Sequence, residues 1–166
     1  MRYVIASASA MILARVQEKL SDWSGVEFRV GRVPDTWSGC DAMVMWWPLA
    51  HDRFGGIPEP GVAKVLRNGR GDDLPGIILA TPSGPGMTSG VGTSRAEIED
   101  YSFRALESCF REYRRRFPES DEKSKILVHI EASGLDIPDL DSSIRGIARA
   151  LQISPGEADK QVNHDD

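Results

Sequence analysis

Apolar residues occur along the chain in short runs, separated by longer segments in which apolar residues recur at helical spacing. The short runs are rich in β-branched and aromatic residues, which favour strands. The third run is almost continuously apolar, as in a strand that is buried on both faces. We predict strands at RYVIA (2–6), VEFRV (26–30), DAMVMWW (41–47), GIILAT (76–81) and KILVHI (125–130).

The segments between these runs have the periodicity and the start signals of helices. Ser94, with Glu97 three residues later, forms a capping box in front of a long apolar stripe, and Pro118 ends that pattern. Pro60 suits the first turn of a helix, so we predict a helix from Pro60 through Leu66. The other predicted helices lie within residues 7–23 and 141–152.

This order of elements, β-α-β-β-α-β-α-β-α, predicts a three-layer α/β/α sandwich with a mostly parallel central sheet. We expect one domain at residues 1–152 and a polar C-terminal tail at residues 153–166. Such sheets bind ligands beyond the carboxyl ends of their strands. The loops that follow residues 47, 81 and 131 should therefore share one rim.

Composition fits a globular chain and argues against several functions. Of the 166 residues, 40% are hydrophobic and 27% charged, and 25 acidic against 20 basic residues give a formal charge of -5. We therefore expect no general affinity for nucleic acid, and the run REYRRRF (111–117) is explained by the favourable position of cations at a helix C-terminus. No apolar stretch approaches the roughly 20 residues of a membrane span, so we expect a cytoplasmic protein that does not bind membranes.

The two cysteines indicate a reducing compartment. Cys40 follows polar residues at the edge of an apolar run and Cys109 falls inside a helical pattern, as buried free thiols do. Neither has a histidine at the spacing of zinc ligands. We therefore expect no metal and no other cofactor.

Four segments together resemble one known family. They are VEFRVGRVPD (26–35), CDAMVMWWPLAHDRFGGIPEPGVAKVL (40–66), EIEDYSFRALESCFREY (97–113) and ILVHIEASGLDIPDL (126–140). In their order and spacing they are similar to the macro domain, the ADP-ribose-binding fold, in the phage and bacterial variant that begins with an extra strand and helix. The resemblance runs through residue 152 and implies ADP-ribose or a related nucleotide as the ligand.

The resemblance also implies where a pyrophosphate would bind. One side would be the loop of Gly55 and Gly56, and the other the loop of Ser133, Gly134 and Leu135. Glycine lets the backbone approach closely enough for its N–H groups to reach phosphate oxygens.

The base and the distal ribose correspond to positions where the chain departs from the family. Arg32, with Asp35 nearby, stands where the family has an aspartate for the adenine amino group. Trp46 and Trp47 stand where the family has an asparagine pair that holds the ribose. One of the two indoles is suited to stack on a base or ribose face instead.

Three residues are candidates for hydrolysis of an ADP-ribosyl or other N- or O-glycosidic linkage. His51 has a side chain suited to activate water at an anomeric carbon, with Asp52 to orient it. Asp136, in the acidic loop after the last strand, is a second candidate for activating water. Two alternatives remain open: an inactive module that engages a protein partner through a Trp-rich rim, and a biosynthetic enzyme that acts on another metabolite.

Overall fold

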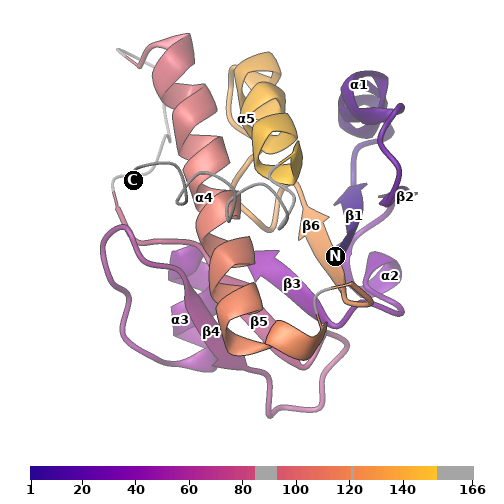
Figure 1. The fold of residues 1–166 in the computed structure, drawn as a ribbon. Helices are drawn as coiled ribbons and strands as arrows, with labels where there is room; N and C mark the ends of the chain where they lie inside the picture. Colours follow the sequence, from indigo (N-terminus) through magenta and orange to yellow (C-terminus); the bar gives the residue numbers. More distant parts are fainter. Residues whose placement is uncertain (85–92, 121, 153–166) are drawn as a thin grey trace, which may run out of the picture.

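The computed structural model describes residues 1–84, 93–120 and 122–152, and Figure 1 shows their arrangement. The predicted C-terminal tail, residues 153–166, lies outside the described residues. The strands are β1 (Arg2–Ser7), β2 (Val26–Val30), β3 (Ala42–Met45), β4 (Lys64–Arg67), β5 (Ile77–Ala80) and β6 (Lys125–His129). The helices are α1 (Ala10–Leu20), α2 (Val33–Thr36), α3 (Trp47–Phe54), α4 (Arg95–Arg116) and α5 (Leu140–Gln152), with a short 3₁₀ helix η1 (Pro118–Ser120).

The strands form one sheet with the order β2-β1-β6-β3-β5-β4. Neighbouring strands are parallel except β4 and β5, which pair antiparallel with Lys64 opposite Ala80 and Arg67 opposite Ile77. Helices α1, α4 and α5 cover one face of the sheet, and α2 and α3 cover the other (Figure 1). The predicted three-layer α/β/α sandwich with a mostly parallel sheet is confirmed.

Helices α4 and α5 are in close contact because α5 carries a glycine where they cross. A Cβ atom built on Gly146 would lie 2.2 Å from the backbone oxygen of Glu99 and 2.8 Å from Cβ of Ser102. The hydroxyls of Ser102 and Ser143 share a buried hydrogen bond of 2.9 Å at the same interface. The second helical layer is therefore held by direct backbone contact as well as by apolar side chains.

The segment between β3 and β5 differs from the sequence prediction. The strand predicted to reach residue 47 ends at Met45, and Trp47 begins α3, with Pro48 in the first helical turn. The prediction of a helix from Pro60 through Leu66 is wrong, because Lys64–Arg67 forms the edge strand β4. Pairing with β5 gives these residues backbone partners, and this tertiary context overrides the local helix signals.

The carboxyl ends of β3, β5 and β6 share one rim, as predicted, although residues 85–92 of the loop after β5 lie outside the described part of the chain. The backbone N–H of Trp46 donates to the carbonyl of Ala132 at 2.9 Å, and the N–H of Thr81 donates to the carbonyl of Met45 at 3.0 Å. These bonds extend the sheet pairing past the strand ends. The rim is therefore a continuous hydrogen-bonded edge from β6 to β5.

Candidate functional site

A cleft of about 820 Å³ lies between α2 and α3, on the sheet face that these two helices cover. It begins at the rim, where Met45 ends β3 and Ala132 follows β6, and it extends along α3 to the turn between β4 and β5. Its apolar wall is formed by Val33, Pro34, Met45, Leu49, Leu74 and Ala132. The rest of the lining is charged and consists of Asp52, Arg53, Arg70, Asp72 and Asp73. The volume of the cleft lies within the range of small-molecule sites.

The far end of the cleft is charged. Arg53 pairs with Asp72, with 2.7 Å between Nη2 and Oδ2, and Asn68 donates to the other carboxylate oxygen at 2.6 Å. These contacts, the Asn68 hydrogen bond first, lower the pKa of Asp72. Arg70 donates through Nη1 to the carbonyl of Arg53 at 3.1 Å. Among the described residues Arg70 forms no ion pair, although its charge helps to lower the pKa of Asp72, and its remaining N–H groups are available to an anion.

Two of the predicted ligand-binding residues flank the α2 wall of the cleft, which Val33 and Pro34 form, but neither of them lines the cleft itself. Arg32 immediately precedes α2 and Asp35 lies inside it, with 3.8 Å between Nε and Oδ2. Their side chains are 81% and 64% exposed. An exposed ion pair of this length contributes little to stability, so both side chains are free to rearrange around a ligand.

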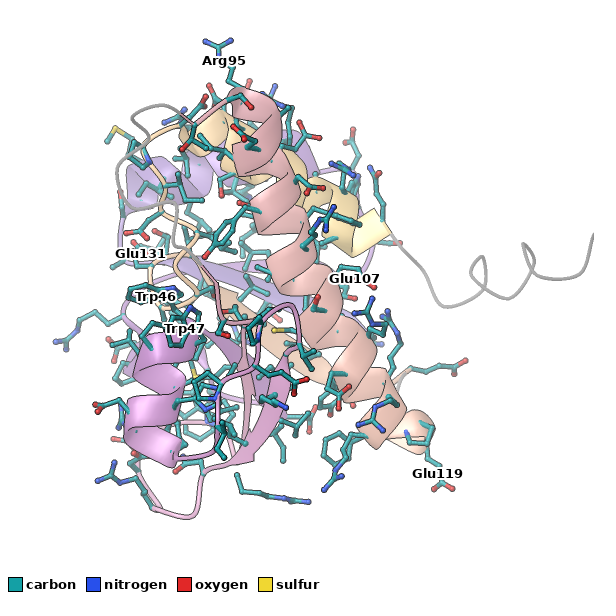
Figure 2. The ribbon with its side chains drawn as sticks, turned by 90° about the vertical axis from the view of Figure 1, so that its left-hand side faces the viewer. Trp46, Trp47, Arg95, Glu107, Glu119 and Glu131 are labelled. Carbon is teal, nitrogen blue, oxygen red and sulfur yellow. The ribbon has the colours of Figure 1, made fainter. Side chains whose placement is uncertain are left out.

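Trp46 turns the chain from β3 into α3. Its indole packs against Gly134, where an added Cβ would lie 3.0 Å from both Cγ and Cδ1 of the ring. Burial raises the pKa of the Tyr101 hydroxyl, while a hydrogen bond from the Trp46 indole lowers it. Figure 2 shows Trp46 and Trp47 at the start of α3, with Glu131 nearby at the same edge in this view. The Trp46 indole therefore connects α3, α4 and the turn after β6.

Trp47 is also tied into the fold. Its backbone N–H donates to the Thr81 hydroxyl at 3.0 Å, so a side chain from the end of β5 satisfies the first N–H of α3. Pro48 has no N–H to offer. In residues 1–84, 93–120 and 122–152 the next N–H, that of Leu49, has no acceptor, which leaves it for a ligand or solvent.

The turn after β6 is closed by its own hydrogen bonds. The backbone N–H groups of Ser133, Gly134 and Leu135 donate to the carbonyls of residues 129–131 at 2.9, 3.1 and 3.0 Å. The Ser133 hydroxyl is buried and donates to the carbonyl of His129 at 2.7 Å, and Leu135 belongs to the core. A phosphate bound by these N–H groups would have to displace bonds that stabilise the turn.

Gly55 and Gly56 lie at the other end of α3. Gly55 ends the helix with φ +78°, and its N–H donates to the carbonyl of His51 at 2.9 Å. Gly56 has φ +81° and packs on Leu66 of β4. Because an eight-residue helix is about 12 Å long, the structure separates this loop from Gly134, which contacts the start of the same helix.

The candidate catalytic residues are also dispersed. Asp52 lines the cleft, whereas Nδ1 of His51 lies 2.9 Å from the carbonyl of Gly55. Asp136 lies in the loop before α5. Burial of its carboxyl and the negative charge of Glu131 raise its pKa, against a backbone hydrogen bond and the nearby His129. The structure thus brings Asp52 alone of the three to the cleft.

The sequence prediction missed the charged end of the cleft. Arg53 belongs to α3, and Arg70 and Asp72 belong to the turn between β4 and β5. The string NGRGDD (68–73) marked this turn as a helix stop, but it gave no sign of a site. Arg53 meets Arg70 and Asp72 because β4 pairs antiparallel with β5, which places the turn between these two strands beside the end of α3.

Comparison of the chain with protein-family models, curated proteins and solved structures finds no significant match. In the described ranges, no three His, Cys, Asp or Glu side chains are grouped as metal ligands are. None of the helices in those ranges is long and apolar enough to span a membrane.

Proposed function

We propose that the chain binds ADP-ribose or a related nucleotide in the cleft between α2 and α3. The observation that carries the proposal is the composition of the cleft, which has an apolar wall near the carboxyl ends of β3 and β6 and a guanidinium without a carboxylate partner at its far end. Nucleotides have the matching chemistry, a flat base whose faces can pack on apolar side chains and an anionic phosphate. The position near the strand ends is the usual ligand position in parallel α/β sheets.

A nucleotide would bind along α3. The base or ribose would lie against Val33, Pro34 and Leu49, and the phosphate would accept hydrogen bonds from Arg70. Arg53 pairs with Asp72, and Arg70 forms no ion pair among the described residues, so Arg70 is the cation that would meet the phosphate, against the negative charges of Asp52 and Asp73 in the same cleft. Arg32 and Asp35 would close over the ligand at the α2 side by exchanging their exposed ion pair for contacts with it.

Asp52 is the group that could support hydrolysis of a glycosidic linkage in this cleft. Its carboxylate would take a proton from a water molecule whose oxygen bonds to the anomeric carbon. The bond from that carbon to the leaving oxygen or nitrogen would break, and the leaving group would take a proton from solvent. An Asp52→Asn variant should lose about 10²-fold or more of such activity while keeping its affinity for ADP-ribose.

Isothermal calorimetry tests the binding proposal. ADP-ribose would be compared with AMP, ribose 5-phosphate and a guanine nucleotide sugar, on wild type and on Arg70→Gln. Loss of a charged hydrogen bond costs about 1.5–3 kcal/mol, so the variant should bind about tenfold or more weakly. Arg67→Gln, at an exposed arginine on β4, is the matched control. Equal affinity of Arg70→Gln and wild type would remove Arg70 from the site, and no binding in the whole panel would reject the proposal.

A module that binds a protein partner is a second candidate. The predicted Trp-rich rim is only partly exposed at Trp46 and Trp47. The candidate is favoured instead by two large apolar side chains that are exposed near α3, those of Leu49 (52%) and Ile57 (84%). Exposed apolar side chains can contribute to a protein interface. For this candidate, no nucleotide would raise the melting temperature, and Ile57→Ser would weaken partner binding without changing stability.

A further inference from the structure

His129 connects β6 to the segment that carries the α2 wall of the cleft. The imidazole is 4% exposed, and its Nε2 lies 2.9 Å from the carbonyl oxygen of Gly31. A carbonyl can accept a hydrogen bond but cannot donate one, so Nε2 carries a hydrogen. Gly31 directly precedes Arg32 and α2. The imidazole therefore reaches across β1 and holds the chain at the point where it enters α2.

The other ring nitrogen faces Glu131. Nδ1 of His129 lies 3.4 Å from Oε2 of the carboxylate. The other oxygen, Oε1, accepts from the Ser7 hydroxyl at 2.7 Å and from the N–H of Ala8 at 3.2 Å. Oε2 is buried and has no hydrogen-bond partner among the described residues. One half of the carboxylate is therefore satisfied, and the other half faces only the imidazole.

Nδ1 of His129 and Oε2 of Glu131 need a hydrogen between them. If Nδ1 were a bare lone pair and Glu131 ionised, two acceptors would face one another, and a buried carboxylate oxygen without a donor costs about 1–3 kcal/mol or more. The N–H of Ala132 lies 3.5 Å from Nδ1, at the limit of hydrogen bonding, and it does not reach Oε2. A single proton between the two atoms satisfies both.

We propose that the folded chain holds one proton between Nδ1 of His129 and Oε2 of Glu131, and that this pair positions the α2 wall of the cleft. The proton links Ser7 at the end of β1, Glu131 and His129 at the end of β6, and Gly31 at the end of β2 in one chain of hydrogen bonds. The proposal concerns the fold around the cleft and does not depend on the ligand that the cleft takes.

The charged groups near His129 and Glu131 favour retention of the shared proton. From the turn after β6, Asp136 adds negative charge, and His129 is among the groups that affect the pKa of its carboxyl. From α2, the nearest charges are Arg32 and Asp35, which are exposed and pair with one another. From β1 the facing group is the neutral Ser7 hydroxyl. A negative environment stabilises a proton on the pair.

The bound proton makes the stability of the fold depend on pH. In the unfolded chain, the histidine loses its proton near its ordinary value of about 6.5 and the glutamate loses its proton near about 4.3. Between about pH 4.3 and 6.5 the unfolded chain carries this one proton as well, so the contribution of the folded pair is full there; as the pH rises above about 6.5 the unfolded chain loses its proton first and the contribution declines. We expect the melting temperature to fall by about 2–4 °C for each kcal/mol lost.

Nuclear magnetic resonance on the full chain tests the proposal directly. At about pH 7.5, roughly one unit above the ordinary histidine value, nitrogen-15 and carbon-13 spectra would report the protonation of the His129 ring and of the Glu131 carboxyl. The expected result is a hydrogen on Nε2 and one further proton on either Nδ1 or the carboxyl. A bare Nδ1 beside an ionised Glu131 would overturn the proposal.

A Glu131→Gln variant provides a second test. The amide nitrogen would donate permanently to Nδ1, and the amide oxygen would accept from Ser7 and Ala8, so the contacts persist without a titratable proton. The fall in melting temperature above about pH 6.5 should therefore disappear in Glu131→Gln and persist in Glu18→Gln, which changes an exposed glutamate of α1. An unchanged fall in Glu131→Gln would reject the shared proton, and the spectra of wild type decide the matter if this variant does not fold.

Discussion

The indole of Trp46 lies against Gly134 so closely that no side chain fits between them. A Cβ atom on Gly134 would lie 3.0 Å from two ring atoms, and the glycine has φ +71°. The contact joins the end of β3 to the turn after β6, the place where connections leave the sheet toward opposite faces. An indole therefore occupies the crevice between these two strand ends, and the open cleft lies to one side of it, along α3.

Replacement of Gly134 by alanine should destabilise the fold for two reasons. A positive φ costs a residue with a Cβ about 1–2 kcal/mol, and overpacking against the indole adds about 1–3 kcal/mol. Urea denaturation of Gly134→Ala and Gly25→Ala separates the two effects, because Gly25 has φ +89° and no atom within 4 Å of its added Cβ. Equal losses in the two variants would show that the indole moves aside at no cost.

Alanine at Gly146 should destabilise the fold, although helix propensity alone favours it. Propensity favours alanine by about 1 kcal/mol, but the new Cβ would lie 2.2 Å from a backbone oxygen of Glu99. Backbone cannot rotate away as a side chain can, so we expect a net loss of about 2 kcal/mol. Arg145→Ala, which removes an exposed ion pair with Glu99, should cost less than about 1 kcal/mol. A Gly146→Ala protein as stable as wild type would contradict the close crossing of α4 and α5.

The Thr81 hydroxyl should contribute more to the stability of the fold than the Thr81 methyl group does. The isosteric change Thr81→Val leaves the N–H of Trp47 without its acceptor and should cost about 1–3 kcal/mol. Thr81→Ser keeps the hydroxyl and should retain most of the stability. Thermal unfolding of the two variants compares them, and a valine variant more stable than the serine variant would show that this hydrogen bond is dispensable.

The Asp136 carboxyl should lower stability at neutral pH. Its pKa is raised by burial first and by Glu131 as well, so the fold favours the protonated form. Below the unfolded value of 3.8 both states bind the proton and nothing is lost. As the pH rises past the raised value, folding becomes less favourable. Asp136→Asn should therefore be at least as stable as wild type at neutral pH, and urea denaturation should show the difference vanishing in acid. A loss of stability at neutral pH would mean that the carboxylate makes a favourable contact.

Much of the fold follows from local sequence patterns. The strand prediction VEFRV (26–30) matches β2, and KILVHI differs from β6 by a single residue at its end. Ser94 and Glu97 form the predicted capping box at the start of α4. In each case the signal lies within a few consecutive residues, because the periodicity of a strand and the cap of a helix are local properties.

The candidate site follows from the sequence less well, because it depends on distant pairings. Pro60 gave a genuine helix-start signal, yet the pairing of β4 with β5 decides that the following residues form a strand. Asp52 was predicted as a site residue, but its neighbours Arg70 and Asp72 come from a turn whose position depends on that strand. The sequence correctly predicts the two tryptophans at the carboxyl-end rim of the sheet. Their contacts with Gly134 and Thr81 could not be predicted, because they form only when β3, β5 and β6 are assembled.

The length of α3 limits the size of any molecule that contacts both ends of the cleft. The apolar wall lies beside the start of the helix and Arg70 lies near its end, and its eight residues span about 12 Å. A lone phosphate or pentose is too short to reach both regions, whereas an extended molecule with a flat group at one end and an anion at the other can do so. Selection among ligands would then depend on the distance between the flat group and the anion of the ligand. Inserting or deleting one helical turn in α3 would change which ligands are accepted.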